Sequence, residues 1–307
     1  MTDTTYDFAI IGGGVAGMAA ALYAGRYKMT TVMFTDNFGG TTSSAHRIVN
    51  YPGIKDITGI QLMTQMTDQI KDLNIPINFD KVIDIKKQEN EFIINTDQKT
   101  IKSKKVLLAI GKKKRKLGIP REDELAGKGI HYCATCDGGF YKSKIVGVIG
   151  GSDAAVTAAI LLADIANEVY LIYRNNKLRA EPMWLESLKK QKNVKIIYNT
   201  EVKELIGEKK LEKVKLNNTK EIELDGLFIE IGAIPNTELL EKLNIEMDNK
   251  TQIKVDKEQR TNIDGIFAAG DITNFSELKQ IVTSTSQGAV ATFHAYKDLK
   301  STHTISY

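Results

Sequence analysis

The sequence predicts an α/β fold of two three-layer domains, the second inserted in the first, and three features predict it. A short apolar run ends in a glycine-rich turn near residue 12 and continues into a helical pattern. The same plan returns near residue 150. The segment after residue 232 is too short for a third domain. We therefore expect this last segment to complete the first domain.

Length and composition narrow the class of protein. A chain of 307 residues has room for about two domains and buries enough surface to fold without disulfides. Its 42% hydrophobic and 26% charged residues exclude a disordered, collagenous or coiled-coil chain. No apolar stretch approaches the ~20 residues of a membrane helix, and no signal peptide is visible. A net charge of +4 is too small to indicate a nucleic-acid partner. We expect a cytoplasmic protein without membrane or nucleic-acid partners.

The first repeat has the order of elements that a dinucleotide-binding unit requires. The apolar run Asp7–Ile11 leads into Gly12-Gly-Gly-Val-Ala-Gly17, followed by a helical pattern from about Val15 to Tyr27 and a strand at Thr31–Thr35. Apolar residues at 60, 62, 63, 66, 70 and 73 predict an amphipathic helix. Further strands are expected near 81–86, 91–96 and 105–110.

The second repeat lies 138 positions later, counted from Gly12 to Gly150. The run Ile145–Ile149 leads into Gly150-Gly-Ser-Asp-Ala-Ala155, and the helical pattern continues to about Ala166. The repetition predicts two Rossmann-like units. Later expected elements are strands at 168–173, 194–198, 201–206, 211–216 and 227–232 and a helix at about 287–299. With linkers near 111–118 and 233–245, the expected domains are 1–114 with 243–307, and 115–242.

The first turn predicts a dinucleotide site rather than a merely structural turn. Gly12 permits the tight turn, Gly14 lets backbone approach a pyrophosphate, and Gly17 allows close packing of helix on strand. The helix N-terminus adds amide donors and a partial positive charge. An acid that binds the ribose usually ends the second strand, where Thr35 and Asp36 are the candidates.

The second turn carries Ser152 where glycine would favour close approach to phosphate. Its side chain either crowds a pyrophosphate or bonds to it through the hydroxyl. The turn therefore leaves two alternatives open, a working nucleotide site and a retained turn without its ligand.

The only two cysteines, Cys133 and Cys136, form a Cys-x-x-Cys pair. A zinc site would need two more ligands among few histidines, of which His131 is nearest, and we expect no metal. A structural disulfide across so short a loop would add little stability. We favour a redox pair, in which the thiolate is the nucleophile. The neighbouring Asp137 is either a proton carrier for this pair or a solvated turn residue.

Five motifs, in this order, resemble the low-molecular-weight thioredoxin reductases over essentially the whole chain. They are Gly12-Gly-Gly-Val-Ala-Gly17, Asn50-Tyr-Pro-Gly53, Cys133-Ala-Thr-Cys-Asp137, the turn at Gly150, and Gly265-Ile-Phe-Ala-Ala-Gly-Asp271. The resemblance implies an FAD domain interrupted by an NAD(P)H-binding domain that carries the redox disulfide. It also implies a homodimer, rotation of the nucleotide domain, and thioredoxin or a similar small redox protein as partner.

The resemblance also implies roles for individual residues. Cys136 would face the flavin, Cys133 would attack the thioredoxin disulfide, and Asp137 would be the acid–base. The implied FAD-binding residues are Gly12, Gly14, Val15, Ala16, Gly17, Thr35, Asp36, Gly39, Gly40, Thr41, Asn50, Val82, Gly111, Gly270, Asp271, Lys279, Gln280 and Ile281. The implied NADPH- or NADH-binding residues are Gly150, Gly151, Ser152, Asp153, Ala154, Arg174 and Arg179.

The chain departs from the family pattern where the 2′-phosphate of NADPH would bind. The family usually reads His-Arg-Arg there, and this chain reads Tyr173-Arg-Asn-Asn-Lys-Leu-Arg179. Replacing the middle guanidinium by Asn175 removes a charge-assisted hydrogen bond that contributes ~1.5–3 kcal/mol. The electron donor therefore stays open among NADPH, NADH and a protein such as ferredoxin. A dithiol oxidase of similar fold is an alternative function.

A run of cations, Lys112-Lys-Lys-Arg-Lys116, lies in the first expected linker. It predicts either a solvated charge run or a docking patch for an acidic partner such as thioredoxin or ferredoxin.

Overall fold

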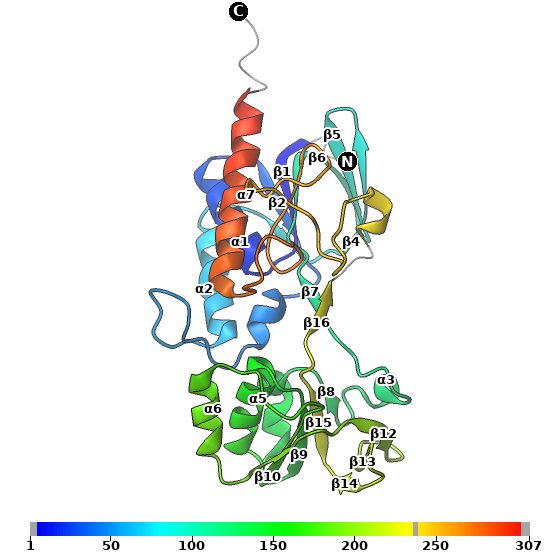
Figure 1. The fold of residues 1–307 in the computed structure, drawn as a ribbon. Coiled ribbons are helices and arrows are strands. Elements are labelled where there is room, and N and C mark those ends of the chain that lie inside the picture. The colour runs from blue at the N-terminus through cyan, green and yellow to red at the C-terminus, as the bar shows by residue number, and fades with distance from the viewer. Residues whose placement is uncertain (1–4, 236–238, 302–307) are drawn as a thin grey trace, which may run out of the picture. The chain divides into compact units, whose positions relative to one another are not determined.

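The computed structural model describes residues 5–235 and 239–301, which form two compact units. The first unit takes residues up to 43, residues 48–113 and residues from 235 onward, and the second takes residues 44–47 and 114–234. Both units combine helices with a largely parallel sheet (Figure 1). The predicted α/β class is confirmed.

The sheet of the first unit follows the order β3-β2-β1-β6-β5-β4, with β17 also paired to β6. Strands β1, β2, β3, β6 and β17 pair in parallel, whereas β4 and β5 form an antiparallel extension. The bounds are β1 Thr5–Ile11, β2 Thr31–Phe34, β3 Ile77–Asn78, β4 Val82–Gln88, β5 Glu91–Thr96, β6 Thr100–Leu108 and β17 Ile266–Ala268.

Three long helices accompany this sheet. They are α1 Val15–Arg26, α2 Gly59–Lys71 and α7 Ile281–Ser301, with the short 3₁₀ helices η1 Gly40–Ser44 and η3 Glu241–Leu243. Helix α2 begins with a capping box, in which Gln61 N–H donates to Thr58 Oγ1 at 3.3 Å and Thr58 N–H donates to Gln61 Oε1 at 3.1 Å.

The C-terminal helix corrects one prediction, because α7 begins at Ile281 rather than near residue 287. Its first turns are rich in threonine, serine and glycine, which favour helix weakly. Packing on α1 overrides this preference: a Cβ at Gly288 would collide with the carbonyl oxygen of Ala16, so the two helices touch through their backbones.

The second unit has a fully parallel sheet in the order β11-β10-β9-β15-β8 and a small antiparallel sheet β12-β13-β14. Its strands are β8 Ile130–His131, β9 Ile145–Ile149, β10 Glu168–Ile172, β11 Val194–Ile197, β12 Val202–Ile206, β13 Lys213–Leu216, β14 Glu221–Glu223 and β15 Gly226–Ile229. Its helices are α3 Glu122–Leu125, α4 Ala134–Asp137, η2 Gly138–Tyr141, α5 Asp153–Ala163 and α6 Pro182–Lys189.

Helix α5 ends at Ala163, three residues before the expected end at Ala166. Long-range capping decides this boundary. The amide of Asn193 donates to the carbonyl oxygens of Ala163 at 2.8 Å and Ala166 at 3.2 Å, which satisfies groups at the helix end as the chain turns toward β10.

The two expected linkers contain short strands that pair with each other. These are β7 Lys112–Lys114 and β16 Ala233–Pro235, and Arg115 N–H donates to the Gly232 carbonyl at 3.0 Å just beyond them. Residues 236–238 of the second expected linker lie outside the described residues. Three-residue strands carry too little alternation to be predicted from sequence.

In residues 5–235 and 239–301, no helix combines the length and the apolar character needed to cross a bilayer.

Candidate active site and nucleotide-binding turns

The first glycine turn connects β1 to α1 and has the geometry of a phosphate cradle. Gly12 has φ +117°, and a Cβ there would collide with the carbonyl oxygen of Ala109. A Cβ at Gly17 would collide with the carbonyl oxygen of Gly12. In contrast, a Cβ at Gly14 would meet nothing within 4 Å. The fold therefore needs Gly12 and Gly17, whereas Gly14 keeps space open at the helix N-terminus.

Two distant loops meet this helix N-terminus. A Cβ at Gly40 would lie 3.3 Å from the Cα of Gly14, and a Cβ at Gly270 would lie 3.1 Å from the Cβ of Ala16. Gly14 is the N-cap of α1 without a side-chain cap, and the first turn has no acidic residue. The arrangement leaves amide donors and the positive end of the helix dipole for an anion.

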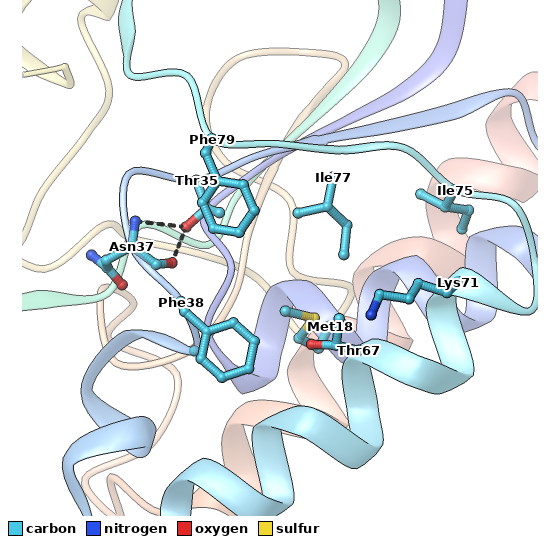
Figure 2. Close-up of a pocket in the computed structure, with 10 residues that line it drawn as sticks. Met18, Thr35, Asn37, Phe38, Thr67, Lys71, Ile75, Ile77 and Phe79 are labelled. Carbon is cyan, nitrogen blue, oxygen red and sulfur yellow. Dashed lines mark hydrogen bonds between the residues drawn. The ribbon is translucent and has the colours of Figure 1, made fainter.

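The loop after β2 borders a cavity of ≈ 370 Å³, which Figure 2 shows with its lining side chains. Thr35 is buried, and its hydroxyl donates to the Asn37 carbonyl at 2.6 Å. Asp36 is exposed, and its carboxylate accepts a hydrogen bond from the Asn37 amide at 2.8 Å. Of the two ribose-binding candidates, Asp36 is the one whose polar group faces solvent.

A second group of expected residues gathers at the start of α7. The amide of Asn50 donates to Gln280 Oε1 at 3.2 Å, and Ser284 Oγ donates to Asp271 Oδ1 at 3.3 Å. Lys279 donates to the carbonyl of Thr273, and burial lowers the pKa of its ammonium. The remaining expected residues lie elsewhere in the unit: Gly39 in the lining of the cavity, Thr41 in η1, Val82 at the start of β4, and Gly111 after β6.

Sequence reasoning missed Gln287, which holds the Gly270 loop. Gln287 is buried, and its Oε1 accepts from Gly270 N–H at 2.8 Å and from Thr273 Oγ1 at 3.0 Å. A glutamine within an apolar helix face was the available signal, but the boundary expected at residue 287 placed it at the helix start.

The turn after β9 in the second unit repeats the first turn. Gly150 has φ +143°, and a Cβ there would collide with the carbonyl oxygen of Glu230, which follows β15 as Ala109 follows β6. A Cβ at Gly151 would collide with the ring of Tyr173. Ser152 caps α5 only by its backbone, since its side chain makes no cap hydrogen bond. The turn is kept, with a side chain at the position where Gly14 has none.

Neighbouring residues of this second turn are partly engaged by the protein itself. Asp153 Oδ1 accepts from Glu181 N–H at 2.7 Å, and Ala154 is exposed. Arg174 and Arg179 are exposed beside the turn. The amide of Asn175 donates to the hydroxyl of Tyr173 at 3.1 Å rather than reaching outward as a guanidinium would.

Cys133 and Cys136 are joined by a disulfide, with their Cα atoms 5.3 Å apart. They follow β8 on the short helix α4, where Cys136 N–H donates to Cys133 Sγ at 3.1 Å. Cys133 is half-buried and Cys136 is exposed, so the pair is accessible to thiols. The described part of the chain holds no group of three or more histidine, cysteine or acidic side chains placed to bind a metal.

Asp137 is held by His131, which Tyr141 holds in turn, and sequence reasoning connected neither side chain to Asp137. His131 Nδ1 lies 2.9 Å from Asp137 Oδ2, and His131 Nε2 lies 2.6 Å from the hydroxyl of Tyr141. The sequence suggested His131 only as a metal-ligand neighbour of the cysteines. The structure instead makes Asp137 a carboxylate with a defined orientation beside the disulfide.

Comparisons with known proteins match nearly the whole chain. A sequence model described as pyridine nucleotide-disulphide oxidoreductase matches residues 6–288. The chain is 38% identical to a thioredoxin reductase of Mycoplasma genitalium over 96% of this chain and 95% of that protein.

Among solved structures, a Lactococcus lactis thioredoxin reductase superimposes with a TM-score of 0.92 at 34% identity, covering 97% of this chain and 100% of that one. A thioredoxin reductase of T. acidophilum gives a TM-score of 0.90 at 34% identity, covering 96% and 99%. The resemblance to low-molecular-weight thioredoxin reductases is confirmed.

Proposed function

The chain belongs to the pyridine nucleotide-disulphide oxidoreductase family, and on that basis we propose that it is an FAD-dependent reductase of the thioredoxin reductase type. Bound FAD would supply the electrons, and the Cys133–Cys136 disulfide would pass them on to the disulfide of thioredoxin or a similar small protein. The observation that carries this proposal is an accessible Cys-x-x-Cys disulfide beside an oriented carboxylate.

The residues of the first unit fit FAD. Gly14 keeps open space at an uncapped helix N-terminus, which suits a pyrophosphate. We assign Gly12, Gly14 and Gly17 to this pyrophosphate, Asp36 to the ribose, and Gly270 and Asp271 to the ribityl chain or phosphate. Asn50, Gln280 and Ile281 would lie toward the flavin. When bound, FAD would supply the hydride and electron-transfer chemistry, which no side chain provides.

The second unit supplies the thiols and their proton carrier. Cys136 would take electrons from the flavin side, and Cys133 would attack the partner's disulfide. The N–H of Cys136 directed at Cys133 Sγ favours a thiolate at that sulfur. Asp137 would give and take the protons of this exchange.

For the assignment of the domains, we propose FAD binding by residues 1–114 and 243–307 and nicotinamide binding by residues 115–242.

We also propose a homodimer. The rings of Tyr27, the C-cap residue of α1, and Tyr296 of α7 stack with their centroids 4.7 Å apart. Tyr23, 39% exposed, and Phe293, 43% exposed, flank them. Such an exposed aromatic group is typical of protein interfaces.

A nicotinamide nucleotide is the proposed donor, because the second turn keeps its backbone geometry at Gly150. Ser152 and Asn175 favour one alternative, in which the donor is a protein such as ferredoxin. Ser152 removes the free approach of backbone to a phosphate, and Asn175 removes one guanidinium. A dithiol oxidase of the same fold would need neither donor and would consume oxygen with small dithiols.

An anaerobic titration of the purified flavoprotein tests the proposal. We expect NADPH or NADH to bleach the flavin at low micromolar concentration and the protein then to reduce thioredoxin. If dithionite and reduced ferredoxin bleach the flavin and neither nucleotide does, the electron donor is a protein such as ferredoxin and not a nicotinamide nucleotide. Flavin reduction without any transfer to a protein disulfide, or oxygen consumption with dithiols alone, would contradict the proposed reductase.

A further inference from the structure

Three side chains near the disulfide form a hydrogen-bonded chain that ends on Asp137. Tyr141 donates or accepts at His131 Nε2 across 2.6 Å, and His131 Nδ1 faces Asp137 Oδ2 across 2.9 Å. All three lie in the second unit, on β8, α4 and η2. This series of hydrogen bonds therefore connects the buried phenol of Tyr141, through the imidazole of His131, to the carboxylate beside the redox pair.

The imidazole of His131 is locked in place. Its side chain is 8% exposed, and β8 places it opposite Phe228 of β15. Its ring stacks on Phe228 at 5.2 Å and meets Tyr141 edge-on at 5.3 Å. A ring packed on two sides has little rotamer freedom, so its two nitrogens keep their partners.

Hydrogen-bond chemistry then assigns the tautomer. An ionised carboxylate only accepts, so Nδ1 must carry the proton and donate to Asp137. Burial, with Asp137 and Asp225 adding to it, raises the pKa of Tyr141 to about 12, which keeps the phenol neutral. The Lys144 ammonium lies 5.4 Å from the Tyr141 ring. A neutral phenol donates to Nε2 and holds the imidazole in this tautomer.

The two oxygens of Asp137 are unequal as a result. Oδ2 is held by His131, whereas Oδ1 has no hydrogen-bond partner among the described residues, and the side chain is 32% exposed. We propose that His131 is a positioning residue, which holds Oδ2 and leaves Oδ1 to carry the proton during disulfide exchange. This inference rests on the proposed function of the cysteine pair.

The exchange balances with Asp137 as the only proton carrier. One cysteine thiol gives its proton to Oδ1, and its thiolate attacks the substrate disulfide, whose sulfur–sulfur bond breaks. The leaving thiolate takes the proton from Oδ1. The second cysteine thiol then gives its proton to Oδ1, and its thiolate attacks the mixed disulfide, which restores Cys133–Cys136. The second leaving thiolate takes this proton from Oδ1 in turn. Two electrons pass from the dithiol to the substrate, both thiol protons end on the products, and Asp137 ends ionised.

Two variants separate the nitrogens of His131. Asparagine places its amide near the position of Nδ1, so His131→Asn keeps a donor for Asp137 and loses Tyr141. Glutamine places its amide near Nε2, so His131→Gln keeps Tyr141 and loses Asp137. His294→Gln is the matched control, because His294 Nδ1 also faces a carboxylate, Glu258 Oε2 at 3.3 Å, in the first unit.

The measurement uses the full-length flavoprotein, reduced with dithionite and mixed with one of two disulfides. Ellman's reagent releases a thiol of low pKa, which leaves without a proton, whereas hydroxyethyl disulfide releases an alkyl thiol that needs one. The choice of dithionite and small disulfides makes the result independent of the nicotinamide donor and of thioredoxin.

With hydroxyethyl disulfide, we expect His131→Gln to slow exchange about tenfold or more, because it loses one charge-assisted hydrogen bond to Asp137. The rate of His131→Asn should stay within about threefold of the wild-type rate. Exchange with Ellman's reagent still needs Oδ1 to take the proton of the attacking thiol, but its leaving thiolate needs no proton. We therefore expect His131→Gln to slow exchange clearly less with Ellman's reagent than with hydroxyethyl disulfide, whereas His131→Asn and His294→Gln should match the wild type. Equal slowing by both His131 variants, or slowing by His131→Gln that is the same for both disulfides, would overturn the positioning role. A wild-type protein inert to both disulfides would instead contradict the redox function itself.

Discussion

The ammonium of Lys114 lies 2.6 Å from the carboxylate of Glu230, which directly follows β15 and whose side chain is only 7% exposed. Burial raises the pKa of Glu230 above its ordinary value of 4.5, and Lys114 partly opposes this. The backbone carbonyl of the same Glu230 lies against Gly150 of the second turn. Glu230 therefore contributes its side chain to the ion pair and its backbone to the packing of that turn.

The pH dependence of stability should carry the sign of this raised pKa. Between pH 4.5 and the raised pKa of the folded state, the folded protein holds a proton that the unfolded chain releases, so the Glu230 contribution to stability falls as pH rises through that window. Glu230→Gln should remove this fall, and its stability relative to wild type should improve from pH 5 to pH 8. Urea unfolding followed by Trp184, the single tryptophan, reports on the unit that holds Glu230. An unchanged pH slope would contradict this prediction.

Lys114→Met should destabilise the second unit by about 2 kcal/mol at pH 8, because it leaves a buried carboxylate without its cation. Lys116→Met is the matched control. Lys116 pairs with Asp123 at an exposed position, and solvent screens that pair. The same unfolding measurement should therefore separate the two lysines, and equal effects would argue against a special role of the buried pair.

Cys136→Ser should abolish reduction of protein disulfides while FAD stays bound. The substitution removes one sulfur of the disulfide and leaves the first unit untouched. The visible flavin spectrum measures occupancy, and insulin precipitation with thioredoxin measures turnover. Thr135→Ser, between the two cysteines, should keep both. Retained turnover in Cys136→Ser would refute the assigned redox pair.

Gly14→Ala should lower FAD affinity roughly 10- to 100-fold without unfolding the protein. The added Cβ meets no protein atom within 4 Å, and the φ of −77° suits alanine, so the cost falls on the ligand's hydrogen bonds. Gly139→Ala, with equally open space, is the control and should keep its flavin. Circular dichroism measures whether the variant is folded, and its flavin content measures FAD binding. Loss of secondary structure in Gly14→Ala, or full flavin content, would each contradict the assignment of Gly14 to FAD binding.

Asn175→Arg should raise the preference for NADPH over NADH about tenfold, since it adds one charge-assisted hydrogen bond to a 2′-phosphate. Asn175 is exposed next to Arg174 and can be lengthened without burying charge. Asn218→Arg adds the same charge on the turn between β13 and β14 and should not change the preference. The ratio of kcat/KM for the two nucleotides is the measurement. A ratio that does not move would place the phosphate clamp elsewhere.

The sequence alone determined the features that local chemistry encodes. Gly12 and Gly150 mark the two turns, because only glycine tolerates their positive φ angles and close carbonyl contacts. Cys133 and Cys136 mark the redox pair, since no other thiol exists in the chain. The strand and helix patterns around them carried the α/β class.

Only the tertiary structure decided the contacts between residues that share no local pattern. The pairs Asn50–Gln280, Lys114–Glu230 and Gly270–Gln287 are brought together by strand order and helix packing. His131 and Asp137 are close in sequence, yet their bond depends on β8 being paired to β15, where Phe228 orients the imidazole. A polar side chain's partner depends on three-dimensional register, whereas a glycine's φ or a cysteine's chemistry belongs to the residue itself.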